Sequence, residues 1–454
     1  MAFIHQLKQE HLLIVGFSER TGLAVAQYLA DKDIPYSISD SRDEGTLSPL
    51  LKGLKVQPRT LYAGKQDSSQ LAGINRVILS PGVPRAIPLI QTALEKRIPV
   101  TAEVELAYLL SPAKSHIGIT GTDGKTTTTT LCYEILKRDF SVRMGGNIGV
   151  PFISFVDELS SDSKVILELS SYMLEDIPYL NCDIASVLNL SPDHLDRYNS
   201  FEDYLEAKKN LLRNQSETDH AILNLDDPHY ERLSRDIKSG ILTFSKDRPD
   251  ATAYIRGSEV IYQDRAIVSL VDIPLRGQHN LENILAAVLI CKQAGVRDSS
   301  IQEVIREFRG LPHRNETVDE LGGVLFINDS KATTINSVAK SILSQDRGII
   351  LLMGGQDKGL DFAHLRQLIE SRVKGLILFG EARDKIRAGL GQHSAILVGD
   401  LEEAFSEALK VAVEGDVVLL SPGCTSFDQY QSYEQRGLHF KELVTRYKKA
   451  YETS

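Results

Sequence analysis

Short apolar runs that end in Gly, Ser, Asp or Asn recur along the chain and alternate with amphipathic stretches. Such runs are typical of strands buried on both faces of a parallel sheet, and the stretches between them are typical of crossover helices. The alternation therefore predicts an α/β fold built on mostly parallel sheets. The runs fall into three groups, at 11–16, 36–40 and 76–82, then at 115–121, 165–170, 185–190 and 221–226, and finally at 324–330, 348–355, 375–380 and 417–423.

Two segments without periodicity separate these groups, Ser111-Pro112-Ala113-Lys114 and Leu311-Pro312-His313. Proline disfavours the helical conformation at the residue before it, so both segments are expected to be breaks. The chain has 454 residues, which at about 150 residues per domain also favours three domains. We expect their bounds at 1–112, 113–312 and 313–454.

Charge and cysteine content exclude several classes of protein. The 51 basic and 61 acidic side chains give a formal net charge of −10 at pH 7, which argues against general attraction to nucleic acid or to an anionic membrane. Cys132, Cys182, Cys291 and Cys424 form no C-x-x-C pair, so neither a zinc site nor a secreted disulfide framework is expected. No apolar run approaches the ~18–20 residues of a membrane span. We therefore expect a cytoplasmic protein that binds no nucleic acid and does not insert into a membrane.

The segment Gly121-Thr122-Asp123-Gly124-Lys125-Thr126-Thr127 follows a predicted strand and precedes a predicted helix. Glycines let backbone N–H groups surround phosphate oxygens, and the helix N-terminus favours anions. Lys125 adds a positive charge, and the Thr126 hydroxyl is a ligand type that Mg²⁺ accepts. The pattern G-x-x-x-x-G-K-[ST] has a glycine where this chain has Ile119, so the match is incomplete. A strand-to-helix turn without a ligand is the structural alternative.

A second glycine loop, Gly16-Phe17-Ser18-Glu19-Arg20-Thr21-Gly22, also lies between a predicted strand and a predicted helix. Asp40 ends the next strand, about where Rossmann units place a ribose-binding acid. The loop lacks the second glycine of G-x-G-x-x-G, which lets a pyrophosphate approach the backbone. From these residues alone, a dinucleotide-dependent oxidoreductase, a nucleotide-sugar site and a packing turn stay open.

Polar side chains follow further strands of the second group. Glu168 ends one strand and Asp193-His194 follows another, at the sheet edge where parallel sheets bind ligands. A carboxylate and an imidazole beside a phosphate loop would hold a metal ion, since Mg²⁺ takes few protein ligands together with phosphate oxygens and water. Each is also an ordinary strand-end residue, and Lys208 alone is typical of a solvated helix face.

In the last third, Arg314, Asp329 and Lys331 lie in loops that flank a predicted strand. Arginine bonds hydroxyls or phosphate, aspartate accepts from ribose hydroxyls, and lysine binds carboxylates. Ordinary salt bridges are the structural alternative for these three side chains.

Motifs from all three expected domains form a recognisable set. They are G-T-D-G-K-T-T at 121–127, G-G-N-I-G at 145–149, L-E-L-S-S at 167–171, D-H-L-D-R at 193–197, G-Q-H-N-L-E-N at 277–283, L-P-H-R at 311–314 and N-D-S-K-A-T at 328–333. Together they resemble the Mur ligases, ATP-dependent enzymes that add amino acids to the cell-wall precursor UDP-N-acetylmuramate. The tail S-P-G-C-T-S-F-D-Q-Y-Q-S-Y-E-Q-R-G at 421–437 is similar to that of the D-glutamate-adding branch. The resemblance covers nearly the whole chain.

The resemblance implies a Rossmann-like N-terminal domain for the UDP substrate, a central P-loop-type ATPase domain and a Rossmann-like C-terminal domain for the amino acid. It implies addition of D-glutamate to UDP-N-acetylmuramoyl-L-alanine, a step of peptidoglycan precursor synthesis that serves cell-wall biogenesis, cell shape and cell division. The carboxylate would attack the γ-phosphorus of ATP, and the amine would then displace phosphate from the acyl phosphate. The implied cofactors are ATP and two Mg²⁺ ions.

The resemblance also implies roles for individual residues. The positions matched as catalytic are Lys125, Glu168, His194 and Lys208, and those matched to metal ions are Thr126, Glu168, His194 and Lys208. Lys208 matches a lysine that carries a carbamate in the family. The positions matched to ATP are Gly121, Thr122, Asp123, Gly124, Lys125, Thr126, Thr127, Asn280, Asn283, Arg314 and Asp329. The positions matched to D-glutamate are Lys331, Thr333, Lys358, Ser426 and Tyr433.

The positions matched to the UDP substrate are Ser18, Arg20, Thr21, Asp40, Ser41, Arg42, Gly82, Asn147, Ser171 and His194. Here the chain departs from the family, because its loop at 16–22 is one residue longer than the usual G-x-G-x-[ST]-G. A folylpolyglutamate synthetase also adds glutamate, but it begins directly with the ATP domain, whereas residues 1–112 come first here. A dinucleotide-dependent oxidoreductase, or a non-catalytic nucleotide-binding protein, would need 16–22 as its main site.

Overall fold

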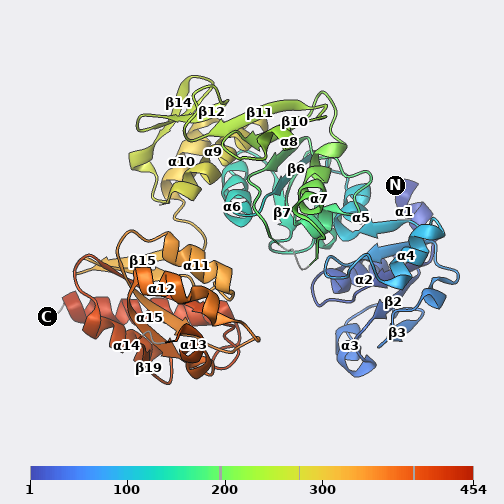
Figure 1. The fold of residues 1–454 in the computed structure, drawn as a ribbon. Coiled ribbons are helices and arrows are strands. Elements are labelled where there is room, and N and C mark those ends of the chain that lie inside the picture. Colours follow the sequence, from blue (N-terminus) through green and yellow to red (C-terminus); the bar gives the residue numbers. More distant parts are fainter. Residues whose placement is uncertain (1, 194–196, 276, 392–393, 453–454) are drawn as a thin grey trace. The chain divides into compact units, whose positions relative to one another are not determined.

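The computed structural model describes residues 2–193, 197–275, 277–391 and 394–452 (Figure 1). The chain divides into two compact units, Met1–Phe308 and Arg309–Ser454. The first unit contains a five-stranded and a nine-stranded sheet, and the second contains a six-stranded sheet. The predicted α/β class with three mostly parallel sheets is confirmed, and the predicted domain boundaries stay predictions.

The N-terminal sheet is fully parallel, with strand order β3-β2-β1-β4-β5. Successive side chains of a strand point to opposite faces, so Leu12 and Ile14 enter one hydrophobic core and Leu13 and Val15 enter another. The strands are β1 Leu12–Val15, β2 Tyr36–Asp40, β3 Leu61–Ala63, β4 Arg76–Leu79 and β5 Val100–Ala102. The helices are α1 Ala2–Leu7, α2 Thr21–Asp31, α3 Glu44–Leu51, η1 Ser68–Leu71, α4 Pro88–Glu95 and α5 Glu103–Leu110.

The central sheet has the order β14-β13-β12-β11-β10-β9-β6-β8-β7, and among the described residues its antiparallel pairs are β12–β13 and β13–β14. Helices α6 and α9 pack on one face and α7 packs on the other (Figure 1). The strands are β6 Ser115–Thr120, β7 Val142–Gly146, β8 Lys164–Glu168, β9 Ile184–Val187, β10 His220–Asn224, β11 Gly240–Ser245, β12 Ala253–Arg256, β13 Glu259–Tyr262 and β14 Arg265–Ser269. The helices are α6 Lys125–Leu136, η2 Phe152–Glu158, η3 Ser171–Leu174, α7 Phe201–Arg213, α8 Tyr230–Leu233, η4 Leu270–Asp272, α9 Gln278–Gln293 and α10 Asp298–Glu307.

One hydrophobic core joins the two sheets of the first unit. It contains Leu29 of α2 and Leu106 of α5 together with Phe152 of η2 and Leu211 of α7. Because a shared core resists separation, the N-terminal and central sheets form one compact unit.

The sheet of the second unit has the order β15-β16-β20-β17-β18-β19, and β15 is its only antiparallel strand among the described residues. Along β17, Leu351 and Met353 enter one core and Ile350 and Leu352 enter the other. The strands are β15 Glu316–Leu321, β16 Val324–Asn328, β17 Gly348–Gly354, β18 Val373–Phe379, β19 Ile396–Leu397 and β20 Asp416–Gly423. The helices are α11 Ile335–Leu343, η5 Phe362–Leu365, α12 Arg366–Arg372, α13 Arg383–Leu390, α14 Leu401–Val411 and α15 Tyr433–Glu452.

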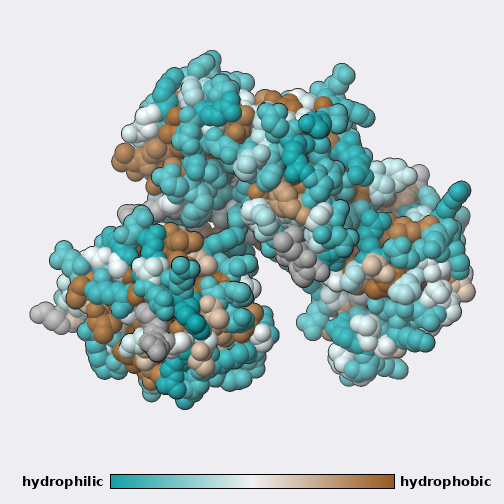
Figure 2. Space-filling view, viewed as in Figure 1, coloured by the Kyte–Doolittle hydropathy of each residue, from teal (hydrophilic) through white to brown (hydrophobic). Residues whose placement is uncertain are grey.

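Hydrophilic residues cover most of the face that Figure 2 shows, and hydrophobic residues form small patches on it. Within the described part of the chain, no helix combines the length and the apolar character that a membrane crossing requires. The four cysteines are buried and carry free thiols.

Candidate active site

The predicted phosphate loop joins the end of β6 to the start of α6. Gly124 caps α6 with a positive φ of 79°, which glycine adopts without strain. A Cβ at this position would lie 2.1 Å from the Asn283 side-chain oxygen on α9. The same oxygen accepts a hydrogen bond from the Thr128 hydroxyl at 3.2 Å, and Asn283 donates to Asn280 at 3.0 Å. Two residues predicted to bind ATP, Asn280 and Asn283, therefore lie beside the loop.

Lys125 lies over the carbonyls of its own loop. Its Nζ donates to the Gly121 and Thr122 carbonyls, each at 2.9 Å. Asn189, which follows β9, supports the loop from the other side, because its side-chain oxygen accepts from the Asp123 amide at 2.8 Å. Sequence reasoning missed Asn189, although it lies near the end of the strand predicted at 185–190.

Glu168 ends β8, and only 2% of its surface is exposed. Its Oε1 accepts from the Asn147 side-chain amide at 2.6 Å, whereas its buried Oε2 has no hydrogen-bond partner among the described residues. Burying a carboxylate oxygen without a hydrogen-bond partner costs free energy unless a ligand binds it. Carboxylate oxygens are also ligands that Mg²⁺ prefers. Ser171 begins η3 shortly after Glu168 and is also buried. His194, predicted to bind metal and substrate, lies outside the described residues.

Lys208 lies on α7 and is only 1% exposed, so the solvated helix face that is typical of such a lysine is not what the structure shows. Its Nζ donates to the Gly121 carbonyl at 2.8 Å and to the Thr120 hydroxyl at 3.3 Å. Burial, and then the positive charge of Lys125, place the pKa of Lys208 well below its ordinary value. The structure thus brings a readily deprotonated amine to the base of the phosphate loop.

The N-terminal glycine loop is closed by its own residues. The Ser18 hydroxyl accepts from the amides of Thr21 and Gly22 at 3.0 and 3.1 Å, which fixes the start of α2. The Arg20 guanidinium turns to the central sheet, where it donates to the Gly146 carbonyl at 2.7 Å and to the Asn147 carbonyl at 2.9 Å. Two residues predicted to bind the UDP substrate, Arg20 and Asn147, are thereby brought together.

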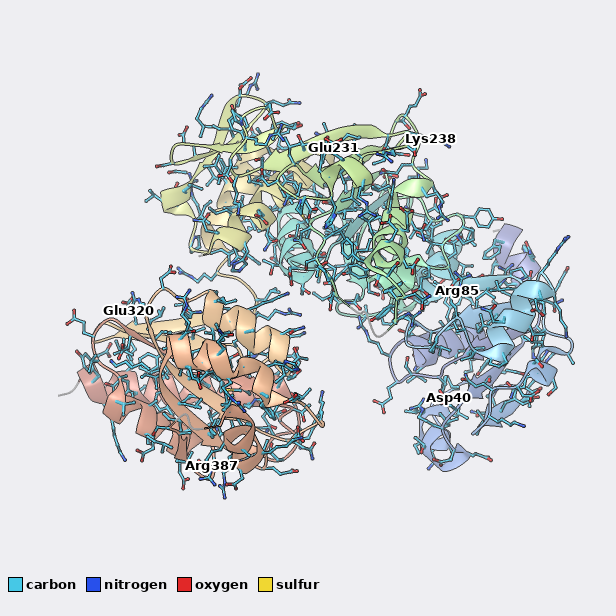
Figure 3. All side chains as sticks on the ribbon, in the orientation of Figure 1. Asp40, Arg85, Glu231, Lys238, Glu320 and Arg387 are labelled. Atoms are coloured by element: carbon cyan, nitrogen blue, oxygen red, sulfur yellow. The ribbon has the colours of Figure 1, made fainter. Side chains whose placement is uncertain are left out.

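Asp40 ends β2 beside this loop (Figure 3). It accepts from the Phe17 amide at 2.6 Å and from the Arg42 guanidinium at 3.0 Å. Burial acts to raise the pKa of Asp40, but the hydrogen bonds from Arg42 and Phe17 outweigh it and hold the pKa below its ordinary value. Two further residues predicted to bind the UDP substrate, Ser41 and Gly82, are exposed. Ser41 follows the end of β2, and Gly82 follows the end of β4.

In the second unit, Lys331 and Tyr433 of the predicted D-glutamate set come together. The Lys331 Nζ donates to the Tyr433 hydroxyl at 3.3 Å and lies 5.0 Å from the centre of its ring. Ser426 is buried, Thr333 is half-buried and Lys358 is exposed. The loops that carry Lys358 and Ser426 are joined by backbone hydrogen bonds between Gln356 and Thr425 at 2.9 and 3.1 Å.

The second unit carries two residues predicted to bind ATP. Asp329 follows β16 and is buried, whereas Arg314 is exposed. Asp329 accepts from the Asn315 amide at 3.0 Å and from the Ser421 hydroxyl at 3.2 Å. Burial raises the pKa of Asp329 to about 6. Both residues belong to the second unit, and their predicted part in nucleotide binding stays a prediction.

Arg436 is the principal residue of the second unit that sequence reasoning missed. It lies on α15, is fully buried, and binds three loops. Its guanidinium donates to the Ser330 hydroxyl and carbonyl at 3.0 and 2.8 Å, and to the carbonyls of Gly354, Thr425 and Cys424 at 3.3, 3.1 and 3.1 Å. The sequence feature that could have identified Arg436 is its position in Y-E-Q-R-G. It follows Tyr433 by three residues and therefore lies on the same face of the helix.

Three family models match the chain in order. The N-terminal domain of a MurD-like Mur ligase matches residues 10–102, the Mur ligase middle domain matches 119–291, and the Mur ligase glutamate ligase domain matches 313–424. Curated relatives match at up to 40% identity over nearly the whole length. The chain belongs to the Mur ligase family.

Within that family, several similar relatives share one name. The chain is 40% identical to UDP-N-acetylmuramoylalanine--D-glutamate ligase of Acidobacterium capsulatum, over 98% of either chain. It is 37% identical to the protein of that name from Koribacter versatilis and 38% identical to that from Geotalea daltonii, over 97% of this chain and 98% of either relative. The chain therefore matches the D-glutamate-adding branch along its full length.

Solved structures share the fold. A pseudomurein peptide ligase type C from Methanothermus fervidus matches with a TM-score of 0.56 at 17% identity, covering 96% of this chain and 99% of that one. MurF ligase from Thermotoga maritima in complex with ADP matches with a TM-score of 0.55 at 18% identity, over 84% and 98%. A bifunctional folylpolyglutamate synthase/dihydrofolate synthase from Yersinia pestis matches with 0.54 at 15%, over 75% and 93%.

Proposed function

We propose that this protein is the ATP-dependent ligase that joins D-glutamate to UDP-N-acetylmuramoyl-L-alanine, a step of peptidoglycan precursor synthesis in the cytoplasm. The observation that carries the proposal is the group formed by the phosphate loop, Glu168 and Lys208, in a chain whose relatives of that name align over nearly its full length. The oxidoreductase alternative requires a dinucleotide in the first glycine loop, and that loop lacks the close-approach glycine.

Amide formation from a carboxylate needs activation, and ATP supplies it. The L-alanyl carboxylate attacks the γ-phosphorus, which gives an acyl phosphate and ADP. The amine of D-glutamate then attacks the acyl carbon, loses its proton and displaces phosphate through a tetrahedral intermediate. The substrate carboxylate and the ATP phosphates are both anions and repel each other. The main tasks of the protein are therefore positioning and charge neutralisation.

Lys125 is the cation that we assign to the phosphates. Its Nζ now bonds two loop carbonyls, and rotation of its side chain toward a bound phosphate would exchange those bonds for charge-assisted ones. The amides of residues 121–127 at the start of α6 add further donors. We assign ATP binding to this loop together with Asn280 and Asn283 from α9. For Arg314 and Asp329 of the second unit, nucleotide binding stays a separate prediction.

The residues around the loop fit Mg²⁺. Glu168 offers a buried carboxylate oxygen without a hydrogen-bond partner among the described residues, and Thr126 offers a hydroxyl in the first turn of α6. Oxygen ligands of this kind, few in number, are what Mg²⁺ takes alongside phosphate and water. Bound Mg²⁺ would neutralise phosphate charge. We assign His194 to a second metal ion or to the substrate.

Lys208 fits a carbamate. Its lowered pKa favours the neutral form of the amine, and that form attacks CO₂ through its lone pair and releases one proton to give an anionic carbamate. The change places a negative charge near Lys125, where the two side chains attract each other instead of competing as cations. An anionic oxygen donor at Lys208 would serve a second Mg²⁺.

The amino acid would bind in the second unit. D-Glutamate has two carboxylates, and Lys331 and Lys358 supply two positive charges. The Lys331 ammonium is already oriented by the Tyr433 hydroxyl and ring. We assign Thr333, Ser426 and Tyr433 to the remaining polar and apolar contacts of the amino acid, and residues 18–21, 40–42, 82, 147 and 171 to the UDP substrate.

The test is release of ADP and phosphate with Mg²⁺, ATP and UDP-N-acetylmuramoyl-L-alanine. D-Glutamate should support turnover, whereas L-glutamate, L-alanine and diaminopimelate should not. Turnover with another of these amino acids would assign a different specificity. Absence of turnover with all of them, from folded protein, would refute the proposed activity.

A further inference from the structure

The segment 146–153 of the central domain is held by two side chains of the N-terminal domain. Arg20 binds the carbonyls of Gly146 and Asn147 at its start. Glu103, which begins α5 and is 2% exposed, accepts from the Ile153 amide at 2.7 Å at its end. Both anchors lie within the first compact unit.

The same segment is tied to the carboxylate that we assign to metal. The Asn147 amide N–H donates to the Glu168 carbonyl at 2.7 Å, and its side-chain amide donates to Glu168 Oε1 at 2.6 Å. The backbones pack closely here, because a Cβ on Gly146 would lie 2.4 Å from the Glu168 carbonyl oxygen. A shift of residues 146 and 147 therefore moves the Glu168 carboxylate or breaks its hydrogen bond.

We propose that Arg20 is a positioning residue, which couples the N-terminal glycine loop to the metal-facing carboxylate Glu168 through Asn147. The chain of contacts is continuous, from the guanidinium to the carbonyl of Asn147 and from the side chain of Asn147 to Glu168. This inference rests on the proposed function, which places the UDP substrate at residues 18–21. Substrate bound there changes the surroundings of Arg20, so a change in substrate affinity and a change in metal affinity are reciprocally linked.

Arg20 suits this task because its planar fork meets two carbonyl oxygens at once, at 2.7 and 2.9 Å. A lysine would donate from a single point. The side chain is exposed, so its charge is screened and its effect comes from geometry rather than from a large gain in stability.

A matched control lies in the same unit. Lys32 of α2 forms an ion pair with Asp157 of η2 at 2.8 Å, and so also connects the N-terminal to the central domain. Its ammonium pairs with Asp157 and lies 5.5 Å from the centre of the Tyr28 ring, so these described contacts are separate from those of Gly146, Asn147 and Glu168. Lys32→Ala removes a cation from the contact between the domains but leaves the proposed connection intact.

The experiment compares Arg20→Ala, Arg20→Lys, Lys32→Ala and Asn147→Ala in the full chain. We expect Arg20→Ala to lower kcat about 30-fold and to raise the Mg²⁺ concentration for half-maximal turnover about tenfold, the range that loss of a charge-assisted hydrogen bond gives. Arg20→Lys should restore part of the loss, and Lys32→Ala should match the wild type. The double variant Arg20→Ala/Asn147→Ala should be no worse than Asn147→Ala, because both act through one connection.

Hydrogen exchange without any ligand gives a second readout. Arg20→Ala should accelerate exchange of amides in 142–153, and Lys32→Ala should not. A change confined to the KM for the UDP substrate, or additive effects of Arg20→Ala and Asn147→Ala, would overturn the inference. If the wild type shows no ligase turnover, the proposed function fails, and unchanged exchange in Arg20→Ala would separately refute the connection.

Discussion

The phosphate loop of the first unit and the loop cluster of the second unit are each built around one buried basic side chain, and the two side chains are held differently. Lys208 has two hydrogen bonds and a pKa well below its ordinary value because of burial and the charge of Lys125. Arg436 has five hydrogen bonds, and burial lowers its pKa only to about 10. The lysine is thus available for covalent chemistry, whereas the arginine is a permanent structural charge.

The difference follows from the two functional groups. A guanidinium offers five donors in a plane and keeps its proton, so oxygens from several loops can satisfy it. An ammonium gives up its proton when burial outweighs its partners. A buried lysine with few partners therefore indicates reactivity more strongly than a buried arginine with many.

The largest expected effect is at Lys208. We expect Lys208→Ala to lower ligase turnover about 10³-fold, because it removes the amine on which we propose a carbamate beside the phosphate loop. A short carboxylic acid added to Lys208→Ala should restore part of the activity by supplying the missing oxygen anion. Steady-state kinetics measures both changes.

The neighbouring Lys209 is the control for this experiment, since it donates to the Arg232 carbonyl and lies apart from the loop. Lys209→Ala should keep turnover within about twofold of the wild type. Labelled bicarbonate should give a carbamate signal in ¹³C NMR of the wild type that Lys208→Ala lacks. Full activity in Lys208→Ala would contradict the contrast between the two buried basic side chains.

Arg436 should matter first for stability. We expect Arg436→Met to destabilise the second unit by about 4 kcal/mol, because five oxygens lose their donor in a buried site. Arg436→Lys should recover only part of this, since a lysine has fewer donors and no planar fork. Urea unfolding followed by hydrogen exchange in both units measures the change, and the first unit is the internal control. Equal stability of Arg436→Met and wild type would show that the loops do not depend on this side chain.

Gly124 tests whether ATP binding depends on the close packing of the phosphate loop on α9. Gly124→Ala should weaken ATP binding about 100-fold, since it strains the positive φ and brings Cβ against the Asn283 side chain. Gly53→Ala is the control, because nothing lies within 4 Å of its Cβ position. Calorimetric titration with an ATP analogue distinguishes the two, and equal affinities would contradict the close packing of the loop on α9.

The smallest expected effect concerns the titration of Asp329. Its pKa of about 6 in the folded state exceeds the ordinary value of 3.8, so the unfolded chain loses this proton first as the pH rises. Ionisation of Asp329 therefore destabilises the folded second unit. This destabilisation is absent below about pH 4 and complete above about pH 6. Asp329→Asn should stabilise the second unit by about 2 kcal/mol at neutral pH and by almost nothing near pH 4. Thermal unfolding at both values measures this, and a gain independent of pH would refute the assignment.

Much of the fold could be predicted from the sequence because buried parallel strands carry continuous apolar runs. Strands with this signal, such as β6 and β17, were found, whereas the short outer strands β3 and β19 carry too few apolar residues to be recognised. The antiparallel extension β12, β13 and β14 was missed, since its half-buried strands alternate with polar residues instead of forming runs.

The phosphate loop was predictable because backbone geometry demands its glycines and its chemistry demands Lys125. The burial of Lys208 was not, since a lysine on a helix gives no sign of which face it occupies. The hydrogen bonds from Arg20 to Gly146 and Asn147 were equally hidden, because the partners are 126 and 127 residues apart in the sequence. Contacts between distant segments need the folded topology.

Arg436 has a consequence for the order in which the protein is made. Every oxygen that it binds belongs to Ser330, Gly354, Cys424 or Thr425, and all four precede it in the chain. Synthesis adds ~5–20 residues per second from the N-terminus, so the ribosome delivers three loops before the side chain that ties them. A nascent chain halted before residue 436 has these loops without their common donor, which makes it a ready target for chaperones and proteases. Completion of α15 is the event that ends this vulnerable interval.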